Sequence, residues 1–265
     1  MHPDQAVDAM HLAYDRTEHK TVPTGSVGLD YILGGGYPVG RCSEIYGETF
    51  TGKTTLALEG VRQMQKLGTV AYIDLAGDFN PDYAEAIGID VDDLLVFHTL
   101  SWLCRYGVDE WVDLYDFIVV DGLQTKSDAL YVERARQTVL AVSQVRTALS
   151  DPYRGTTGGY LEHASVRVRM SKRGDLYAAD VSRNTYGNPG TSRRSCRFRI
   201  GPDGIDQADE VFGLAVQTGL IDTERGRHYF RGDYLGHGRE AALRAVLSRP
   251  EGISDLEAAL ADKLW

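Results

Sequence analysis

The sequence predicts an α/β fold with a central, mostly parallel sheet flanked by helices. Short apolar runs such as Val70–Ile73 and Phe117–Val120 alternate with segments of good helix formers between Arg41 and Arg146. Strands that alternate with helices pair in parallel, because each helix returns the chain to the same edge of the sheet. Runs that are apolar throughout indicate strands that are buried on both faces.

Later segments predict further strands and a separate small unit. Residues 164–170, 176–183 and 196–200 are strand-like and are separated by turn residues. Beyond Gly204, apolar residues recur at helical spacing and are expected to be core: Val211, Leu214, Ala215, Leu243, Val246, Leu247, Leu256, Leu260 and Leu264.

Charge is unevenly distributed. The 265 residues carry a net charge of −10, which argues against a nucleic-acid binder when taken alone. Residues 74–121 contain twelve acids and one Arg, whereas residues 151–200 contain ten Lys or Arg and four acids. The second segment is therefore the candidate for contact with DNA, although charge alone fits a solvated sheet face equally well.

The sequence gives no sign of a membrane protein. No apolar run approaches the roughly 18 residues that a membrane helix needs, and Met1–Lys20 lacks the apolar region of a signal peptide. A cytoplasmic protein without membrane contact is expected.

A phosphate-binding loop is the strongest local signal. Residues 47–54 match the pattern of Gly, four residues, Gly, Lys and Thr, after a strand-like run and before a helical one. Backbone N–H groups of such a loop wrap phosphates, Lys53 reaches the β and γ phosphates, and the Thr54 hydroxyl binds Mg²⁺. ATP and Mg²⁺ are the expected ligands, held by Gly47, Glu48, Thr49, Phe50, Thr51, Gly52, Lys53, Thr54 and Thr55.

A carboxylate at a strand end is expected to complete the Mg²⁺ site. Asp121 follows the buried run Phe117–Val120 and is the preferred metal residue, together with Thr54. Asp74, which ends Val70–Ile73, is the competitor, because strands also end in Asp for turn reasons.

Longer stretches around these motifs resemble the bacterial RecA recombinase family. The run Thr24-Gly-Ser-Val-Gly-Leu-Asp30, followed by Pro38-Val-Gly-Arg41 and Glu44-Ile-Tyr-Gly47, leads without a break into the phosphate-binding loop. Matches continue in the same order through Tyr72-Ile-Asp74, Ile118-Val-Val-Asp121, Thr156-Thr-Gly-Gly159 and the C-terminal region.

The resemblance implies an N-terminal oligomerisation segment (residues 1–22), a RecA-like ATPase core (23–204) and a small α+β C-terminal domain (205–265). It also implies a homo-oligomeric helical filament that binds single-stranded DNA and pairs it with homologous duplex DNA in recombination and repair. Segment 1–22 is short for its implied role.

The resemblance also assigns roles around the nucleotide. Tyr83 matches a tyrosine that stacks on adenine, and Asn80 replaces an acid that contacts the base; an ordinary turn at Asn80 and a helix aromatic at Tyr83 are the alternatives. Gln144 resembles a glutamine that senses the γ-phosphate, and its alternative is a plain strand end. Arg183 corresponds to a basic residue that reaches a neighbour's ATP across the filament interface.

Residues 146–157 correspond to the family's second DNA-binding loop. Arg146 and Arg154 are expected to contact phosphates and Tyr153 a base, and a mobile Gly-rich loop is the alternative. The expected DNA-binding residues are Arg146, Tyr153, Arg154, Thr156, Thr157, Gly158 and Gly159.

Two departures bear on mechanism. Where the family has the glutamate that activates the attacking water, this chain has Ala76, with Asp78 two residues further on; Lys53, Asp121, Gln144 and Asp78 remain the catalytic candidates. Thr185 replaces a second basic residue that pairs with Arg183. Slow hydrolysis is therefore predicted.

Two functions from different classes follow. One is an ATP-dependent recombinase with slow hydrolysis, of a pared-down kind that suits a phage. The other is a non-hydrolysing ATP-binding paralogue that acts as a recombination mediator or an annealing module. A helicase or transporter motor is disfavoured, because such motors lack the C-terminal domain.

Overall fold

A computed structural model of the chain describes residues 20–100, 114–134, 137–145, 161, 163–186 and 195–264. The chain divides into two compact units, one formed by Thr21–Ile205 and the other, among the described residues, by Lys20 and residues 206–264.

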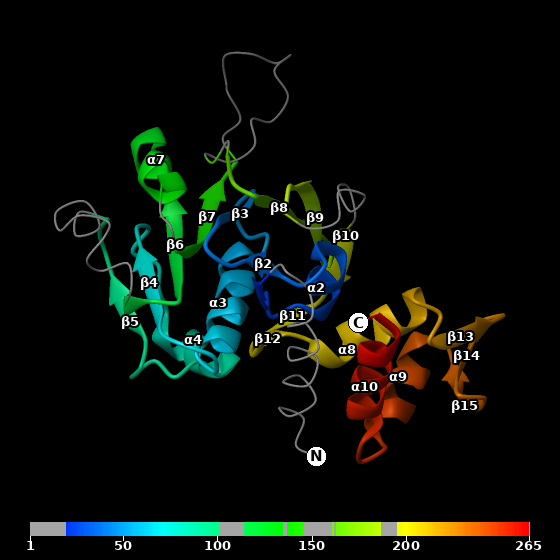
Figure 1. The fold of residues 1–265 in the computed structure, drawn as a ribbon. Helices are drawn as coiled ribbons and strands as arrows, with labels where there is room; N and C mark the ends of the chain where they lie inside the picture. The colour runs from blue at the N-terminus through cyan, green and yellow to red at the C-terminus, as the bar shows by residue number, and fades with distance from the viewer. Residues whose placement is uncertain are drawn as a thin grey trace. The chain divides into compact units, whose positions relative to one another are not determined.

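The first unit is built on an eight-stranded sheet with the order β10-β9-β8-β3-β7-β6-β4-β5 (Figure 1). From β8 to β5 every neighbouring pair is parallel, whereas β9 pairs antiparallel with both β8 and β10. The predicted mostly parallel sheet is confirmed. The strands are β3 (Cys42–Gly47), β4 (Val70–Asp74), β5 (Leu95–Phe97), β6 (Phe117–Leu123), β7 (Thr138–Gln144), β8 (Val166–Arg173), β9 (Leu176–Asn184) and β10 (Ser195–Phe198).

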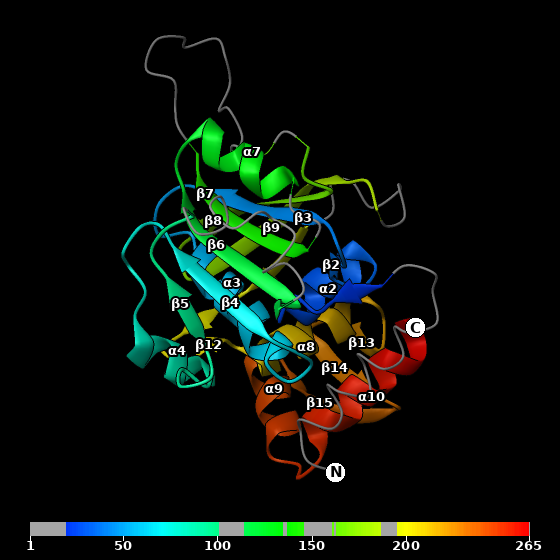
Figure 2. The ribbon, with the colours of Figure 1, turned by 60° about the vertical axis from the view of Figure 1, so that its left-hand side comes forward.

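Helices cover both faces of this sheet (Figure 2). Helices α2 (Val27–Leu33), α3 (Lys53–Met64) and α4 (Pro81–Ile87) pack into one core, and α7 (Lys126–Arg134) packs into the other. Strand β6 contributes to both cores, because successive side chains of a strand point to opposite faces of the sheet. Phe117 and Val119 belong to the first core, and Ile118 and Val120 belong to the second.

Two short antiparallel pairs complete the first unit. Strand β1 (Thr21–Val22) pairs with β2 (Tyr37–Pro38), and β11 (Ile200–Gly201) pairs with β12 (Gly204–Ile205).

The second unit combines helices with a small sheet. Helices α8 (Gln207–Gln217), α9 (Arg239–Leu247) and α10 (Gly252–Leu264) accompany an antiparallel sheet of β13 (Ile221–Glu224), β14 (Arg227–Phe230) and β15 (Asp233–His237). Six of the expected core residues are buried, namely Val211, Leu214, Ala215, Val246, Leu256 and Leu260. Leu243 is partly buried, the side chain of Leu264 lies outside the described part of the chain, and the prediction for Leu247 is wrong, because Leu247 is 53% exposed. Residues four apart share a helix face, so Ala242 and Val246 are the buried pair of α9 and Leu247 lies off that face.

No helix among the described residues combines the length and the apolar character that crossing a bilayer requires.

Candidate nucleotide site at the carboxyl edge of the sheet

The phosphate-binding loop joins the end of β3 to the start of α3. A Cβ at Gly47 would lie 2.4 Å from the carbonyl oxygen of Met170, so only glycine fits there. Gly52 has a φ of 79°, which favours glycine, and it gives the first turn of α3 no side-chain cap. The first N–H groups of a helix without such a cap are suited to a phosphate, so the loop fits the triphosphate of ATP.

Within the loop, side chains converge on one carbonyl. The Glu48 carbonyl oxygen accepts a hydrogen bond from Thr51 Oγ1 at 2.8 Å and one from Lys53 Nζ at 2.5 Å. Burial lowers the pKa of Lys53, and the carboxylate of Asp121 opposes this shift. Phe50 has a φ of 61° and is 88% exposed, so it contributes backbone rather than packing to the loop.

Asp121 lies beside the start of α3. Its Oδ2 accepts a hydrogen bond from the hydroxyl of Thr54 at 2.8 Å and one from Tyr72 at 2.7 Å. Burial raises the pKa of Asp121, and the bonds from Tyr72 and Thr54 oppose that shift. The two expected Mg²⁺ residues are thus in direct contact. The sequence analysis did not predict Tyr72 as a member of the site, although Tyr72-Ile-Asp74 is one of the stretches that resemble the RecA family.

Asp74 is occupied by the turn that follows β4. Its carboxylate accepts backbone N–H bonds from Gly77 at 2.8 Å, Asp78 at 3.2 Å and Phe79 at 3.0 Å. This is the turn role that Asp at a strand end often has. The geometry therefore favours Asp121 over Asp74 as the metal residue.

The position of the missing glutamate lies on the same edge. Ala76 is exposed, and a Cβ at Gly122 would lie 2.8 Å from the Ala76 Cβ. Asp78 is also exposed. Gly122 directly follows Asp121, so a longer side chain at residue 76 would start beside the residue next to the metal residue.

Gln144 ends β7 directly opposite Gly47. The two residues are partners in the parallel pairing of β3 and β7, and Val145 donates its N–H to the Gly47 carbonyl at 3.1 Å. The side chain of Gln144 is exposed at this edge. A polar side chain here stands next to the loop and immediately before residues 146–160.

The two residues expected at the base lie on α4. Asn80 caps this helix, because its side-chain oxygen accepts the N–H of Tyr83 at 3.1 Å. This is the ordinary turn role that the sequence offered as the alternative to contact with the base. The hydroxyl of Tyr83 lies 2.9 Å from that of buried Thr55. Tyr83 is half-buried and therefore still presents part of its ring beside α3.

Two apolar side chains that the sequence did not suggest lie against the loop. A Cβ at Gly52 would lie 2.5 Å from Ile200 and 3.0 Å from the ring of Tyr177. The ammonium of Lys172 lies 4.7 Å from the centre of that ring. The pairing of β3 with β8 brings the β8–β9 hairpin, and with it Lys172 and Tyr177, to the loop, so no local motif could have indicated these residues.

Comparison with known proteins identifies the family of this chain. Residues 6–101 match the model of the RecA N-terminal domain. RecA of Caulobacter vibrioides is 30% identical over 296 residues, which cover 92% of this chain and 82% of that protein. The chain belongs to the RecA family. RecA of Thioalkalivibrio sulfidiphilus is 29% identical over 299 residues, covering 92% of this chain and 84% of that protein.

A solved structure shows the same fold. The crystal structure of the RadB recombinase matches with a TM-score of 0.56 and 20% identity, covering 70% of this chain and 98% of that one. The chain is therefore a P-loop protein of the general ATPase kind found in the RecA family.

Within this RecA-family core, Arg183 does not lie at the phosphate-binding loop of its own chain. Arg183 pairs with Arg167 across β9 and β8, and Arg167 pairs with Glu44 on β3. The loop begins at Gly47, three residues further along β3, which corresponds to about 10 Å. The strand register therefore places Arg183 level with the middle of β3 rather than with the loop.

The expected DNA-binding residues lie outside the described part of the RecA-family core. They are Arg146, Tyr153, Arg154, Thr156, Thr157, Gly158 and Gly159. Most of the segment expected to oligomerise, residues 1–19, is also outside it.

Proposed function

We propose that this protein is an ATP-dependent recombinase that assembles as a filament on single-stranded DNA and pairs it with homologous duplex DNA. The observation that carries the proposal is the position of Gln144. It lies opposite Gly47 of the phosphate-binding loop and two residues before the segment 146–157, which corresponds to a DNA-binding loop of the family. One side chain can therefore respond to the nucleotide and move the start of the proposed DNA segment.

The residues of the site divide the work. The N–H groups of residues 47–54 and the ammonium of Lys53 hold the phosphates, and Thr54 and Asp121 hold Mg²⁺. Bound Mg²⁺ supplies charge neutralisation at the β and γ phosphates. Tyr83 and Asn80 flank the base, and Arg183 contacts the nucleotide of a neighbouring protomer.

Hydrolysis is slow in this proposal because Ala76 cannot accept a proton. Asp78 is exposed and two residues away, so it aligns a water less well than a glutamate at residue 76 would. Loss of a general base typically lowers a rate by roughly 10²–10⁴-fold and leaves binding intact. A long-lived ATP-bound filament follows.

The domain assignment is also part of the proposal. Residues 23–204 form the ATPase core with the DNA-binding segment, residues 205–265 form an accessory C-terminal domain, and residues 1–22 contact a neighbouring protomer. The division of the chain near Ile205 supports the second boundary.

Imaging of the purified protein with single-stranded DNA tests the proposal. Samples with ATP, with a non-hydrolysable analogue and without nucleotide are compared, alongside a phosphate-release assay. Helical filaments that require nucleotide support the recombinase. Monomers or rings that bind ATP without coating DNA support instead a non-hydrolysing mediator or annealing module, a function that Ala76 and Thr185 favour.

A further inference from the structure

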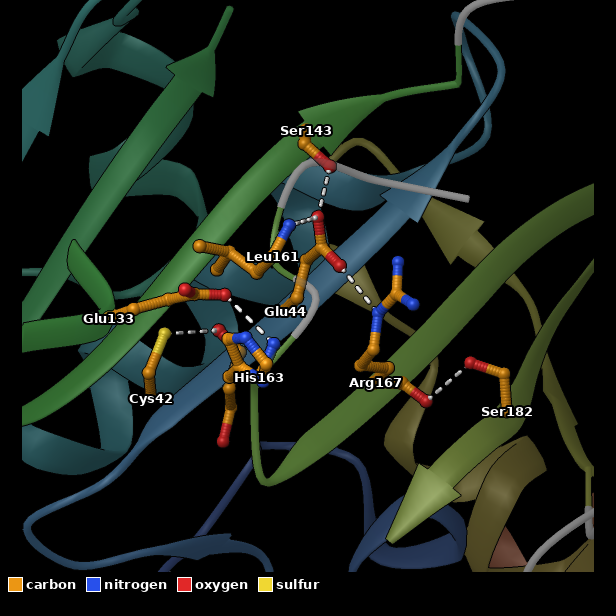
Figure 3. A network of polar contacts seen from close by, with 9 residues as sticks. Cys42, Glu44, Glu133, Ser143, Leu161, His163, Arg167 and Ser182 are labelled. Carbon is orange, nitrogen blue, oxygen red and sulfur yellow. Dashed lines mark hydrogen bonds and ion pairs between the residues drawn. The ribbon is translucent and has the colours of Figure 1, made fainter. Parts of the chain in front are cut away.

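A buried carboxylate lies on β3, three residues before the phosphate-binding loop begins. Glu44 has no exposed surface, and three residues from other parts of the chain donate hydrogen bonds to it (Figure 3). Its Oε1 accepts bonds from Ser143 Oγ at 2.7 Å and from Leu161 N at 3.4 Å. Its Oε2 accepts a bond from Arg167 Nε at 2.8 Å.

The two donors to Oε1 flank residues 146–160. Ser143 lies on β7 just before Gln144, and Leu161 is a fully buried residue that follows the segment. One oxygen atom on the strand that leads to the phosphate-binding loop therefore contacts one residue before the segment and one residue after it.

Arg167 connects the same carboxylate to two further parts of the site. Its guanidinium lies 5.0 Å from the ring centre of Tyr46, the residue directly before Gly47. On its other side, Arg167 is the cross-strand partner of Arg183. Like charges placed opposite each other repel, and the Glu44 carboxylate neutralises one of them.

Stability is a weak reason for this arrangement. A buried ion pair loses hydration that its attraction barely recovers, so apolar residues of similar volume are often as stabilising. Fully bonded buried networks instead fix one geometry, because each partner left without its bond is costly. The arrangement therefore suits a positioning role better than a stabilising one.

We propose that Glu44 is a positioning residue that couples the nucleotide site to residues 146–160. The inference rests on the proposed function, since it takes that segment to contact single-stranded DNA. A shift of β3 or of the loop on nucleotide binding moves the carboxylate, and the carboxylate moves Ser143, Leu161 and Arg167 with it. Gln144 acts at the surface of this edge, and Glu44 acts beneath it.

The test measures coupling rather than activity. The affinity for a fluorescent oligothymidylate is measured with and without a non-hydrolysable ATP analogue, and the ratio is the coupling factor. Glu44→Gln keeps the volume but loses the charged partner of Arg167, and Ser143→Ala removes one bond while Oε1 keeps the N–H of Leu161. Asp209→Asn is the matched control, because Asp209 is a buried carboxylate bonded to Arg239 at 3.0 Å in the other unit.

We expect Glu44→Gln to lower the coupling factor by about fivefold or more, within the usual range of 5–150-fold for two-site coupling. Ser143→Ala lowers it by less, Asp209→Asn leaves it unchanged, and analogue affinity without DNA stays within about twofold in all three. The inference would be overturned if folded Glu44→Gln and Ser143→Ala proteins had the same coupling factor as the wild type.

A second readout separates this inference from the proposed function. Hydrogen exchange of peptides covering residues 143–145 and 161–167 is followed with and without the analogue, in the absence of DNA. If wild-type protein responds and Glu44→Gln does not, Glu44 couples even if the protein never binds DNA. If both proteins respond alike, or neither responds, the role assigned to Glu44 is wrong.

Discussion

The Thr54 hydroxyl donates a hydrogen bond to Asp121 Oδ2 at 2.8 Å, which joins the start of α3 to the end of the buried run in β6. Asp121→Asn keeps an acceptor for Thr54 and Tyr72 but removes the charge that holds Mg²⁺. We expect Mg²⁺ to stop strengthening analogue binding in titration calorimetry, and phosphate release to fall by roughly 100-fold or more, since a metal ion typically contributes several kcal/mol to such reactions.

Asp74→Asn is the matched control for this prediction. Asp74 accepts three backbone N–H bonds in the turn after β4, so its loss should lower the melting temperature and leave the Mg²⁺ effect in place. The opposite pattern, in which Asp74→Asn abolishes the Mg²⁺ effect and Asp121→Asn retains it, would show that the metal residue has been misassigned.

Asp30 makes stability depend on pH. Burial raises its pKa from 3.8 to about 7, so between about pH 4 and pH 7 the folded state binds a proton that the unfolded state has lost. Stability from this group is therefore present at low pH and is lost as pH rises to 7. Asp30→Asn removes the effect and still accepts the Thr24 N–H.

The free energy of unfolding is measured by denaturant titration at pH 5 and pH 8. Relative to Asp30→Asn, the wild type should lose on the order of 2–3 kcal/mol over this range. Asp175→Asn, at an exposed turn position, serves as control and should follow the wild-type curve. Parallel curves for Asp30→Asn and the wild type would show that Asp30 is not the cause.

Patterns of neighbouring residues were enough to predict most strands of the sheet and the phosphate-binding loop. The run Phe117–Val120 is apolar throughout because alternate residues enter two different cores, so a strand buried on both faces could be inferred. The phosphate-binding loop needs only adjacent residues to adopt its geometry, and glycines stand where the backbone requires them. Leu247 was placed in the core wrongly because an apolar residue one position past the buried face of a helix matches the same pattern.

Contacts between distant strands could not be predicted in this way. The Tyr72–Asp121 bond depends on the pairing of β4 with β6, and the place of Tyr177 beside Gly52 depends on the pairing of β3 with β8. Glu44 looks like an ordinary polar residue of a strand. Its burial depends on Arg167, which lies more than one hundred residues along the chain.

Ala76→Glu should convert the protein into a faster ATPase. Residue 76 is exposed and its Cβ lies beside Gly122, the residue after Asp121, so a glutamate there can reach a water near the metal. We expect phosphate release with single-stranded DNA to rise by roughly 10²–10⁴-fold, the usual contribution of a general base. Ala76→Gln has the same shape without a base, and equal rates for the two variants would exclude this explanation of slow turnover.

Arg183 should act on the ATP of a neighbouring molecule, because the strand register places it level with Glu44 and not at its own phosphate-binding loop. Arg183→Ala and Lys53→Ala should each lower DNA-dependent phosphate release by at least about tenfold, since each removes a charge from every site. Mixing the two inactive proteins creates some interfaces with an intact Lys53 on one side and an intact Arg183 on the other. Equal mixtures should therefore recover up to roughly a quarter of the wild-type rate if assembly is random.

A mixture no more active than its components would place Arg183 outside the shared site. Arg183→Lys keeps the charge and should retain more activity than Arg183→Ala.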